Sequence, residues 1–345
     1  MRVVLVGTGV LPIPPDGYGG VERTIAEFAT ALRAAGVDVA VLNHVRQRQS
    51  TDEYRFAWEL PGLLPAYDGT IVHASTPVVA NRLRWAGRPY VYTTHSRHWF
   101  DRGGVRSRWG HWLERRAVAG ATAFVALTDP LAARVREDLA PRPLPPTEVI
   151  PIGVDLARFQ PRFEQRLGNT ALGVGVVAPF KRWELAAAGL KGTGWRLVLV
   201  GPNPDPGYAE RVRAAGDQVE ITGEVSDSEL LARYAGSDLL VHPSSVEVLA
   251  GSVVQGLAAG LPVIGGPAVR GLVDDGVTGW LAPSDDPVRF VEMIRARAHE
   301  LAGDVPRLRA LGGAARAAAE ARFGWPAVVA AHLRLYDQVA PAFTR

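Results

Sequence analysis

The sequence predicts an α/β protein with two parallel sheets, each covered by helices on both faces. Short aliphatic runs, the first at Val3–Val6, alternate with segments whose apolar residues recur at helical spacing. This alternation starts again after a proline-rich stretch at Ala140–Asp155, and 345 residues suffice for two domains of ordinary size. We therefore expect two Rossmann-like domains, the first at 1–160 and completed by 327–345, the second at 161–326.

The first domain is predicted to begin with a strand, a loop and a helix. A continuous aliphatic run such as Val3–Val6 is typical of a strand buried on both faces. The glycines and prolines of residues 7–20 cannot continue a regular element. A helix is expected at Val21–Ala35, because its apolar residues share one face and Gly36 follows them. Further strands are expected at Val37–Leu42, Thr70–His73, Tyr90–Thr94 and Ala123–Ala126.

The second domain is predicted to repeat the alternation after a defined, proline-restricted connector. Ligands of doubly wound domains bind beyond the carboxyl ends of the strands, so we expect a cleft there, between the two domains. Strands are expected at Leu172–Val177, Arg196–Val200, Val219–Thr222, Leu239–His242 and Pro262–Gly265. Helices are expected at Arg182–Leu190, Ala209–Ala214, Asp227–Tyr234, Ser252–Ala259, Pro287–Leu301 and Trp325–Val339.

Composition excludes several classes of protein. The chain has no cysteine, so disulfides, thiolate metal sites and cysteine nucleophiles are excluded. No apolar run approaches the roughly 20 residues that span a bilayer, and Gly7 interrupts the apolar start before it resembles a signal peptide. We expect a cytoplasmic protein without a transmembrane segment. A net charge of only +3 disfavours nucleic acid as a partner.

The densest basic segment, Arg97–Arg116, interleaves arginine and histidine with aromatic residues. A solvated amphipathic segment is the simplest interpretation, and the alternatives are an anion site for the acceptor or a weak contact with a membrane surface. Loops are expected at 44–60 and 96–116, where they would shape the acceptor pocket. Candidate acceptor-binding residues in the second of these loops are Arg97 and His98, followed by Arg102 and Arg106.

Two glycine clusters precede the first helix. The sequence GTG at 7–9 resembles part of a dinucleotide fingerprint, but the prolines that follow delay the helix, so an NAD enzyme is disfavoured. Gly19 and Gly20 lie directly before the helix, where backbone amides and the helix dipole favour an anion. They are candidate diphosphate contacts, and the alternative is a plain surface turn.

A second anion site is predicted around Glu247, in the loop after the strand that ends at His242. The helix that follows would present the unbonded amides of Gly251, Ser252 and Val253 at the carboxyl edge of the sheet. Gln255 on its first turn would be close enough to share a ligand with Glu247. A carboxylate there can accept hydrogen bonds from sugar hydroxyls, and the alternative is that Glu247 caps the helix.

At this point a resemblance becomes specific. Glu247, then Gln255 eight positions later and GLAAGLPVIG, resemble the E-x7-E signature of family 4 retaining glycosyltransferases, which have the GT-B fold. Most of the chain is similar to that family, including its closing helix, which returns to the first domain. The other similar segments are GYGGVERTIAEFATALRAAGVDVAVL at 17–42, VIPIGVDLARFQP at 149–161, APFKRWELA at 178–186 and GEVSDSELLARYAGSDLLVHPS at 223–244. The 36 arginines beside two lysines (38 − 2) are typical of GC-rich bacteria such as actinobacteria.

The resemblance implies a role for each matching position. Gly19 and Gly20 match the loop whose amides contact the donor diphosphate, and Lys181 matches the lysine that neutralises it. Glu247 matches the glutamate near the hydroxyls of the transferred sugar, and Gln255 stands where a second glutamate holds the ribose. The implied donor is a nucleoside-diphosphate sugar, with UDP the first candidate and dTDP or GDP the next.

The resemblance also implies a chemistry. His95 matches a histidine near the reacting centre, although by itself it would be a satisfied histidine at a strand end. The product would keep the anomeric configuration of the donor, with Glu247 favouring an oxocarbenium-like state and no covalent intermediate required. The sequence contains no Asp-x-Asp pair, so no metal is expected.

Two departures from the family pattern bear on donor binding. Val176 stands where the family has an arginine, which leaves one cation missing unless Arg182 replaces it. Gln255 offers one acceptor oxygen where a carboxylate offers two. This fits a donor with a deoxyribose, or weaker binding of the donor. An altered GT-B protein therefore stays open as the alternative: a nucleotide-sugar epimerase, a non-glycosidic coupling enzyme or a nucleotide-binding pseudoenzyme.

Overall fold

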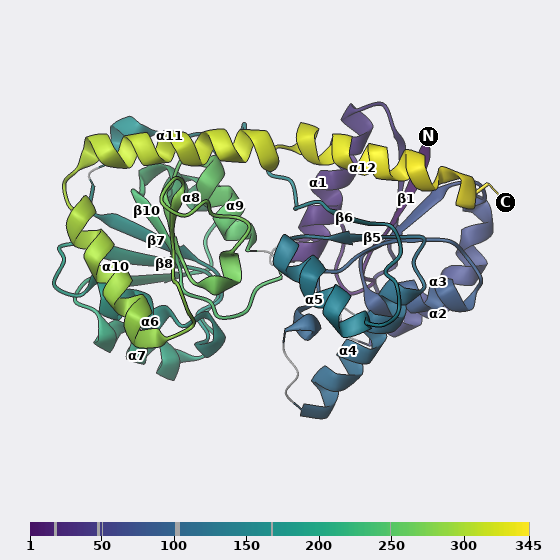
Figure 1. Ribbon diagram of the computed structural model, residues 1–345, viewed down its shortest axis with the longest axis horizontal. Helices are drawn as coiled ribbons and strands as arrows, with labels where there is room; N and C mark the ends of the chain where they lie inside the picture. The colour runs from purple at the N-terminus through teal and green to yellow at the C-terminus, as the bar shows by residue number, and fades with distance from the viewer. Residues whose placement is uncertain are drawn as a thin grey trace. The chain divides into compact units, whose positions relative to one another are not determined.

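Each of two units of the chain holds one six-stranded parallel sheet (Figure 1). The computed structural model describes residues 1–16, 19–46, 49, 51–100, 104–166, 168–248 and 250–344. The first unit is Met1–Gly153 with Trp325–Arg345, and the second is Val154–Gly324. Both divisions fall a few residues before the predicted boundaries. The return of the last helix to the first unit agrees with the expected fold class.

The first sheet has the strand order β2-β1-β3-β4-β5-β6. Right-handed crossovers place α1 on one face and α2 to α5 on the other. Helix α12 packs against α1. The strands are β1 (Arg2–Val6), β2 (Asp38–Leu42), β3 (Ile71–Ala74), β4 (Val91–Thr93), β5 (Ala123–Ala126) and β6 (Thr147–Val149). The helices are α1 (Gly20–Ala34), α2 (Asp52–Leu63), α3 (Pro77–Trp85), α4 (Gly104–Ala119), α5 (Asp129–Leu139) and α12 (Trp325–Val339), with the short 3₁₀ helices η1 (Leu64–Tyr67), η2 (Arg97–Trp99) and η6 (Ala340–Ala342).

Three expectations for this unit were wrong. The segments 44–60 and 96–116 are not loops, because most of α2 and most of α4 lie in them. Both helices expose aromatic residues among their basic ones, so their sequences lack the uniformly polar outer face that marks a surface helix. The proline-rich connector also contains a strand, β6, which pairs with β5 over three residues. Proline is tolerated next to β6 because β6 is an edge strand.

The second sheet has the order β12-β11-β10-β7-β8-β9. Helices α6, α7 and α10 cover one face, and α8, α9 and α11 cover the other. The strands are β7 (Thr170–Val174), β8 (Arg196–Val200), β9 (Val219–Gly223), β10 (Leu239–His242), β11 (Val263–Gly265) and β12 (Gly279–Leu281). The helices are α6 (Trp183–Leu190), α7 (Pro206–Ala215), α8 (Asp227–Gly236), α9 (Gly251–Ala258), α10 (Pro287–Leu301) and α11 (Val305–Arg322), with 3₁₀ helices η3 (Phe163–Gln165), η4 (Pro179–Lys181) and η5 (Pro267–Val269).

The elements that the sequence did not predict here are α11 and β12. Helix α11 buries mostly small residues, among them Gly312, Ala315 and Ala319, which give little apolar periodicity. Strand β12 is three residues long and begins with Gly279. A Cβ atom added to Gly279 would lie 2.0 Å from the carbonyl oxygen of Val263. Only glycine permits that approach.

Among the described residues, no helix is both long and apolar enough to cross a membrane.

Candidate active site

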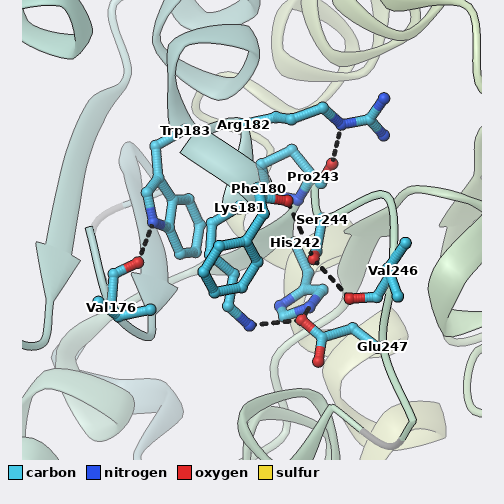
Figure 2. Close-up of polar contacts among 10 residues, drawn as sticks. All are labelled: Val176, Phe180, Lys181, Arg182, Trp183, His242, Pro243, Ser244, Val246 and Glu247. Atoms are coloured by element: carbon cyan, nitrogen blue, oxygen red, sulfur yellow. Dashed lines mark hydrogen bonds and ion pairs between the residues drawn. The ribbon is translucent and has the colours of Figure 1, made fainter. Parts of the chain in front are cut away.

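Three titratable side chains meet at the carboxyl end of β10 (Figure 2). Lys181 comes from η4, His242 is the last residue of β10, and Glu247 lies in the loop that follows. Nζ of Lys181 and Nε2 of His242 both contact Oε1 of Glu247, His242 at 3.0 Å. The side chains of Lys181 and Glu247 are 13% and 14% exposed. The structure thus brings together two of the predicted site residues, Lys181 and Glu247, and adds His242.

Glu247 is a carboxylate at neutral pH. Burial by itself raises its pKa, but the hydrogen bonds from His242 and Lys181 and the positive charge of Lys181 outweigh burial and lower the pKa to about 2. Burial lowers the pKa of His242, so a neutral imidazole donates its Nε2–H to Glu247. The other oxygen of Glu247, Oε2, accepts no hydrogen bond from any residue that the structure describes. Oε1 therefore holds the Glu247 side chain in place, and Oε2 can accept a hydrogen bond from a ligand.

Glu247 does not cap α9, so that alternative was wrong. The N-cap of α9 is Ala250, and no side chain caps the helix. The amide of Val253 is not unbonded either, because it donates to the carbonyl of Ala250 at 2.9 Å. Within the described segments nothing accepts from the amides of Gly251 and Ser252. Two of the three predicted donors at this helix end thus keep their anion-binding capacity.

Gln255 is held by the neighbouring helix. The hydroxyl of Tyr234 has one hydrogen, which Oε1 of Gln255 at 3.0 Å and the carbonyl of Ser252 at 3.2 Å share. Its side-chain nitrogen has no recorded partner in the part of the chain that the structure describes. Gln255 can therefore donate to a ligand through its nitrogen, while its one acceptor oxygen already accepts from Tyr234. No contact joins it to Glu247.

Arg182 points away from the Lys181 cluster (Figure 2). Its backbone is left-handed, at φ 55°, which turns the two neighbouring side chains apart. Nε of Arg182 donates to the carbonyl of Pro243 at 2.9 Å, and the guanidinium pairs with Asp285 at 2.9 Å. The structure therefore does not place Arg182 as a substitute for the cation missing at Val176. The carbonyl of Val176 instead accepts from Nε1 of the buried Trp183 at 3.0 Å.

In the first unit, the loop before α1 is fixed by side chains at its base. The hydroxyl of Thr8 donates to Glu22 of α1 at 2.6 Å. Asn43 accepts from the amide of Gly9 at 2.8 Å and donates to the carbonyl of Leu11 at 2.9 Å. Glu22 and Asn43 were not predicted. An acidic first-turn residue and a polar residue ending a strand are the signals that mark them.

The loop ends at Gly19, which is the N-cap of α1, and Gly20 is exposed. A Cβ on Gly19 meets Pro15 at 2.8 Å, whereas a Cβ on Gly20 meets nothing within 4 Å. Gly19 is thus required by packing, and Gly20 leaves open space at the amino end of a helix. The neighbours Gly17 and Tyr18, and Leu249 of the second unit, lie outside the described residues.

Gly20→Ala is expected to weaken donor binding without loss of stability. The added methyl group fits the fold, but it occupies the approach to the amides at the start of α1. The matched control is Gly62→Ala in α2, where a Cβ also meets nothing within 4 Å. Thermal melts should stay level or rise for both variants. A role for Gly20 would be contradicted if both variants lost nucleotide affinity equally, or if neither variant lost any.

His95 follows β4 and lines a pocket of the first unit. Burial lowers its pKa to about 4, so the imidazole is neutral at physiological pH. The same pocket is lined by Phe28 of α1 and by Trp325 and His332 of α12. His73 lies beside it and bonds Tyr336 at 2.6 Å and Thr93 at 2.7 Å. His95 is therefore placed as a neutral hydrogen-bonding group in a largely apolar wall.

Glu114 fixes the segment that carries His95, and the sequence did not single it out. This fully buried residue of α4 accepts from the hydroxyl of Tyr92 at 2.8 Å and from Nε1 of Trp99 at 3.2 Å. Tyr92 lies in β4 and Trp99 in η2, so Glu114 ties both sides of His95 to one helix. Burial raises the pKa of Glu114 to about 7, and the four hydrogen-bonding neighbours only partly offset it.

Glu114→Gln should gain stability relative to the native chain as pH rises. A folded pKa of about 7 lies above the unfolded value of 4.5, so the stabilisation is complete below pH 4.5 and is lost as pH rises through 7. Between about pH 5 and pH 8 the difference in free energy of unfolding should shift by about 2 kcal/mol in favour of the variant. Urea unfolding at both pH values measures it. A difference that does not change with pH would contradict the buried, late-titrating carboxyl.

The candidate acceptor residues lie in and after η2. His98 packs its ring against Gly110 of α4, where a Cβ would come within 2.4 Å of the imidazole, and its carbonyl accepts from His111 at 3.1 Å. The packing gives His98 a structural role, and acceptor binding by it stays a prediction. The side chains of Arg97 and Arg106 and the whole of Arg102 lie outside what the structure describes.

Comparisons with known proteins identify the class to which the chain is similar. The family model for Glycosyltransferase Family 4 matches residues 18–158, and the model for glycosyl transferases group 1 matches residues 181–299. A D-inositol 3-phosphate glycosyltransferase of Kineococcus radiotolerans is 28% identical over 97% of this chain and 94% of its own. A GDP-mannose-dependent alpha-mannosyltransferase of Mycolicibacterium smegmatis is 28% identical over 98% of each chain.

Solved structures show the same fold. The sucrose-phosphate synthase of Thermosynechococcus elongatus superimposes with a TM-score of 0.79 at 20% identity, over 99% of each chain. HepE of Anabaena in complex with UDP-glucose gives 0.73 at 17% identity, over 98% of this chain and 100% of its own. The protein is therefore a glycosyltransferase with the GT-B fold. Within that class, the first unit matches the model for Glycosyltransferase Family 4, which the sequence motifs predicted, and the second unit matches the model for glycosyl transferases group 1.

Proposed function

We propose that this glycosyltransferase moves a sugar from a nucleoside-diphosphate donor to a small acceptor, with retention of the anomeric configuration and without a metal ion. The observation that carries the proposal is the carboxylate of Glu247, anchored through Oε1 by Lys181 and His242 while Oε2 accepts nothing from the described residues. An ionised carboxylate that is held in place beside a lysine can bind a ligand with both sugar hydroxyls and phosphate: the carboxylate accepts hydrogen bonds from the hydroxyls, and the lysine pairs with the phosphate.

In the proposed reaction, an oxygen of the acceptor bonds to the anomeric carbon as the bond from that carbon to the diphosphate oxygen breaks. The acceptor hydroxyl gives its proton to the departing phosphate on the same face. Lys181 and the amides of Gly251 and Ser252 offset the charge that grows on the leaving group. Glu247 orients the donor sugar and stabilises positive charge at its ring. His95, Gly19 and Gly20 take the roles that the family pattern implies.

Lys181 interacts with both Glu247 and the donor diphosphate in this proposal. In the structure it neutralises Glu247, and a bound diphosphate would compete for the same ammonium group. The three hydrogens of a lysine can serve both partners at once, whereas a planar guanidinium could not turn between them as readily. The donor class rests on this pair, with UDP as the first candidate and GDP or dTDP as the next.

The test uses the donor alone, because slow hydrolysis needs no acceptor. The chain is incubated in EDTA with UDP-, GDP-, ADP- and dTDP-sugars, and the released sugar is followed by proton NMR before it mutarotates. We expect one nucleotide series to release a sugar with the donor's anomeric configuration. Inversion would contradict the proposed stereochemistry, and a requirement for added Mg²⁺ would contradict metal independence. Conversion of the donor to an epimer would favour the epimerase alternative.

Gln255→Glu is expected to shift the choice of nucleotide. A second carboxylate oxygen would accept from the 2′-hydroxyl of a ribose while the first keeps its bond from Tyr234. The ratio of dissociation constants for dTDP and UDP should rise in the variant by about tenfold, the effect of one added hydrogen bond to a charged acceptor. An unchanged ratio would mean that Gln255 does not contact the ribose.

A further inference from the structure

The face of the first unit formed by α2, α3 and α4 carries an unusual number of exposed aromatic side chains. Eleven large apolar side chains of the described residues are exposed, and six of these belong to the three helices. Four are tryptophans, which are between 44% and 75% exposed. The six are Tyr54, Trp58, Trp85, Val105, Trp109 and Trp112.

These side chains form one surface because the helices are neighbours on the same face of the sheet (Figure 1). Asn81 of α3 donates to the carbonyl of Leu113 at 2.8 Å, and Arg84 donates to that of Arg116 at 2.8 Å. These two bonds hold α3 and α4 side by side in parallel register. Trp85, at the end of α3, therefore lies close to the last turns of α4.

Helix α4 directs its aromatic residues away from the core. Ser107, Gly110 and Glu114 are buried, and Val105, Trp109 and Trp112 are exposed on the opposite stripe. The rings of Trp109 and Trp112 stack at 4.7 Å. A binding partner could cover these tryptophans without any change in the packing of α4. Their exposure to water is unfavourable in free energy.

Arginine lies among the tryptophans. The guanidinium of Arg82 sits 5.1 Å from the ring of Trp58, and that of Arg116 sits 4.9 Å from Trp112. The sequences of α3 and α4 contain six arginines (Arg82, Arg84, Arg106, Arg108, Arg115 and Arg116) and a single acidic residue, the buried Glu114. This face is thus cationic as well as aromatic.

Several carboxylates on the adjoining elements are already paired. Asp138 of α5 pairs with Arg134 and lies 3.6 Å from His111 of α4. Glu59 of α2 forms ion pairs with Arg46 and His44, and Asp68 pairs with Arg88. Among the described residues, no ion pair joins a carboxylate to an arginine of α3 or α4. We name the surface made by Trp58, Arg82, Trp85, Trp109, Trp112 and Arg116 the tryptophan–arginine face.

We propose that the tryptophan–arginine face docks on the surface of an anionic lipid bilayer. Indole rings favour the headgroup level of a membrane, where the ring meets acyl chains and the N–H meets water. Arginine binds lipid phosphates while its aliphatic part covers apolar surface. The six arginines of α3 and α4, beside a single buried carboxylate, complement the negative charge of an anionic headgroup layer. This inference is independent of the proposed donor chemistry.

The test measures partition of the full chain onto vesicles. One set contains phosphatidylcholine with phosphatidylglycerol, and the other contains phosphatidylcholine alone. The native chain should sediment with the anionic vesicles, with a blue shift in tryptophan fluorescence, and added salt should release it. Trp109→Ser with Trp112→Ser should weaken the partition by about tenfold or more, and Arg108→Gln with Arg116→Gln should weaken it on anionic vesicles.

The matched control replaces two exposed valines of the second unit, Val277→Ser with Val288→Ser, and should bind as the native chain does. All substituted side chains except Arg116 are exposed, and thermal melts confirm that each variant is folded. The proposal is overturned if the native chain ignores anionic vesicles or if both tryptophans can be replaced without effect. It is also overturned if sedimentation without lipid shows self-association that the tryptophan variant abolishes, since a second copy would then cover the face.

Discussion

Glu247→Gln is expected to lower the rate of sugar transfer by about a hundredfold or more, the usual effect of removing one preorganised charged group from a transition state. The amide has the shape of the carboxylate, but it cannot stabilise positive charge at the sugar ring. It also loses one acceptor position for a sugar hydroxyl. Turnover of the nucleotide sugar that the donor survey identifies is the measurement, made with saturating donor so that kcat and KM separate.

Stability must be measured beside activity in this variant. The folded pKa of Glu247, about 2, lies below its usual value of 4.5, so its ionised form stabilises the fold above pH 4.5 and that contribution is lost as pH falls towards 2. Glu247→Gln should therefore be less stable than the native chain at neutral pH and should approach it in acid. If kcat is unchanged at a temperature where both chains are folded, Glu247 does not take part in the reaction.

Lys181→Ala is expected to weaken the binding of the nucleotide by about 10- to 100-fold, because a charge-assisted hydrogen bond to phosphate contributes about 1.5–3 kcal/mol. The sequence provides a matched control, since Lys191 is the only other lysine and is exposed beyond the end of α6. Lys191→Ala should bind nucleotide as the native chain does. Calorimetric titration with the nucleoside diphosphate compares the three chains, and equal affinities for all of them would remove Lys181 from the donor site.

Most of the fold could be predicted because buried parallel strands leave a clear signal. The runs at Ala123–Ala126, Arg196–Val200 and Leu239–His242 are strands with the predicted bounds. What escaped prediction has a physical cause in each case. Helix α11 packs through glycine and alanine, and α4 exposes tryptophan where a surface helix normally exposes charge. Apolar periodicity reports burial, so it fails where small residues are buried or large ones are exposed.

The site could be predicted only in part. Lys181 and Glu247 were identified from their sequence context, and the structure brings them into contact. The partners that fix such groups come from distant positions: Glu114, which is 19 residues beyond His95, has no local motif to mark it. The direction of the Arg182 side chain depends on its left-handed backbone, which cannot be predicted from the sequence FKRW.

The most direct test of the central claim, that Glu247 serves the sugar and Lys181 the diphosphate, is a titration of Glu247→Gln with a nucleoside diphosphate and with the corresponding nucleotide sugar. The variant releases Lys181 from its ion pair, so the nucleoside diphosphate should bind at least as tightly as to the native chain. The additional affinity that the sugar provides should be lost. If both ligands instead lose affinity equally, or if the sugar still adds its full share, the assignment of Glu247 to the donor sugar is wrong.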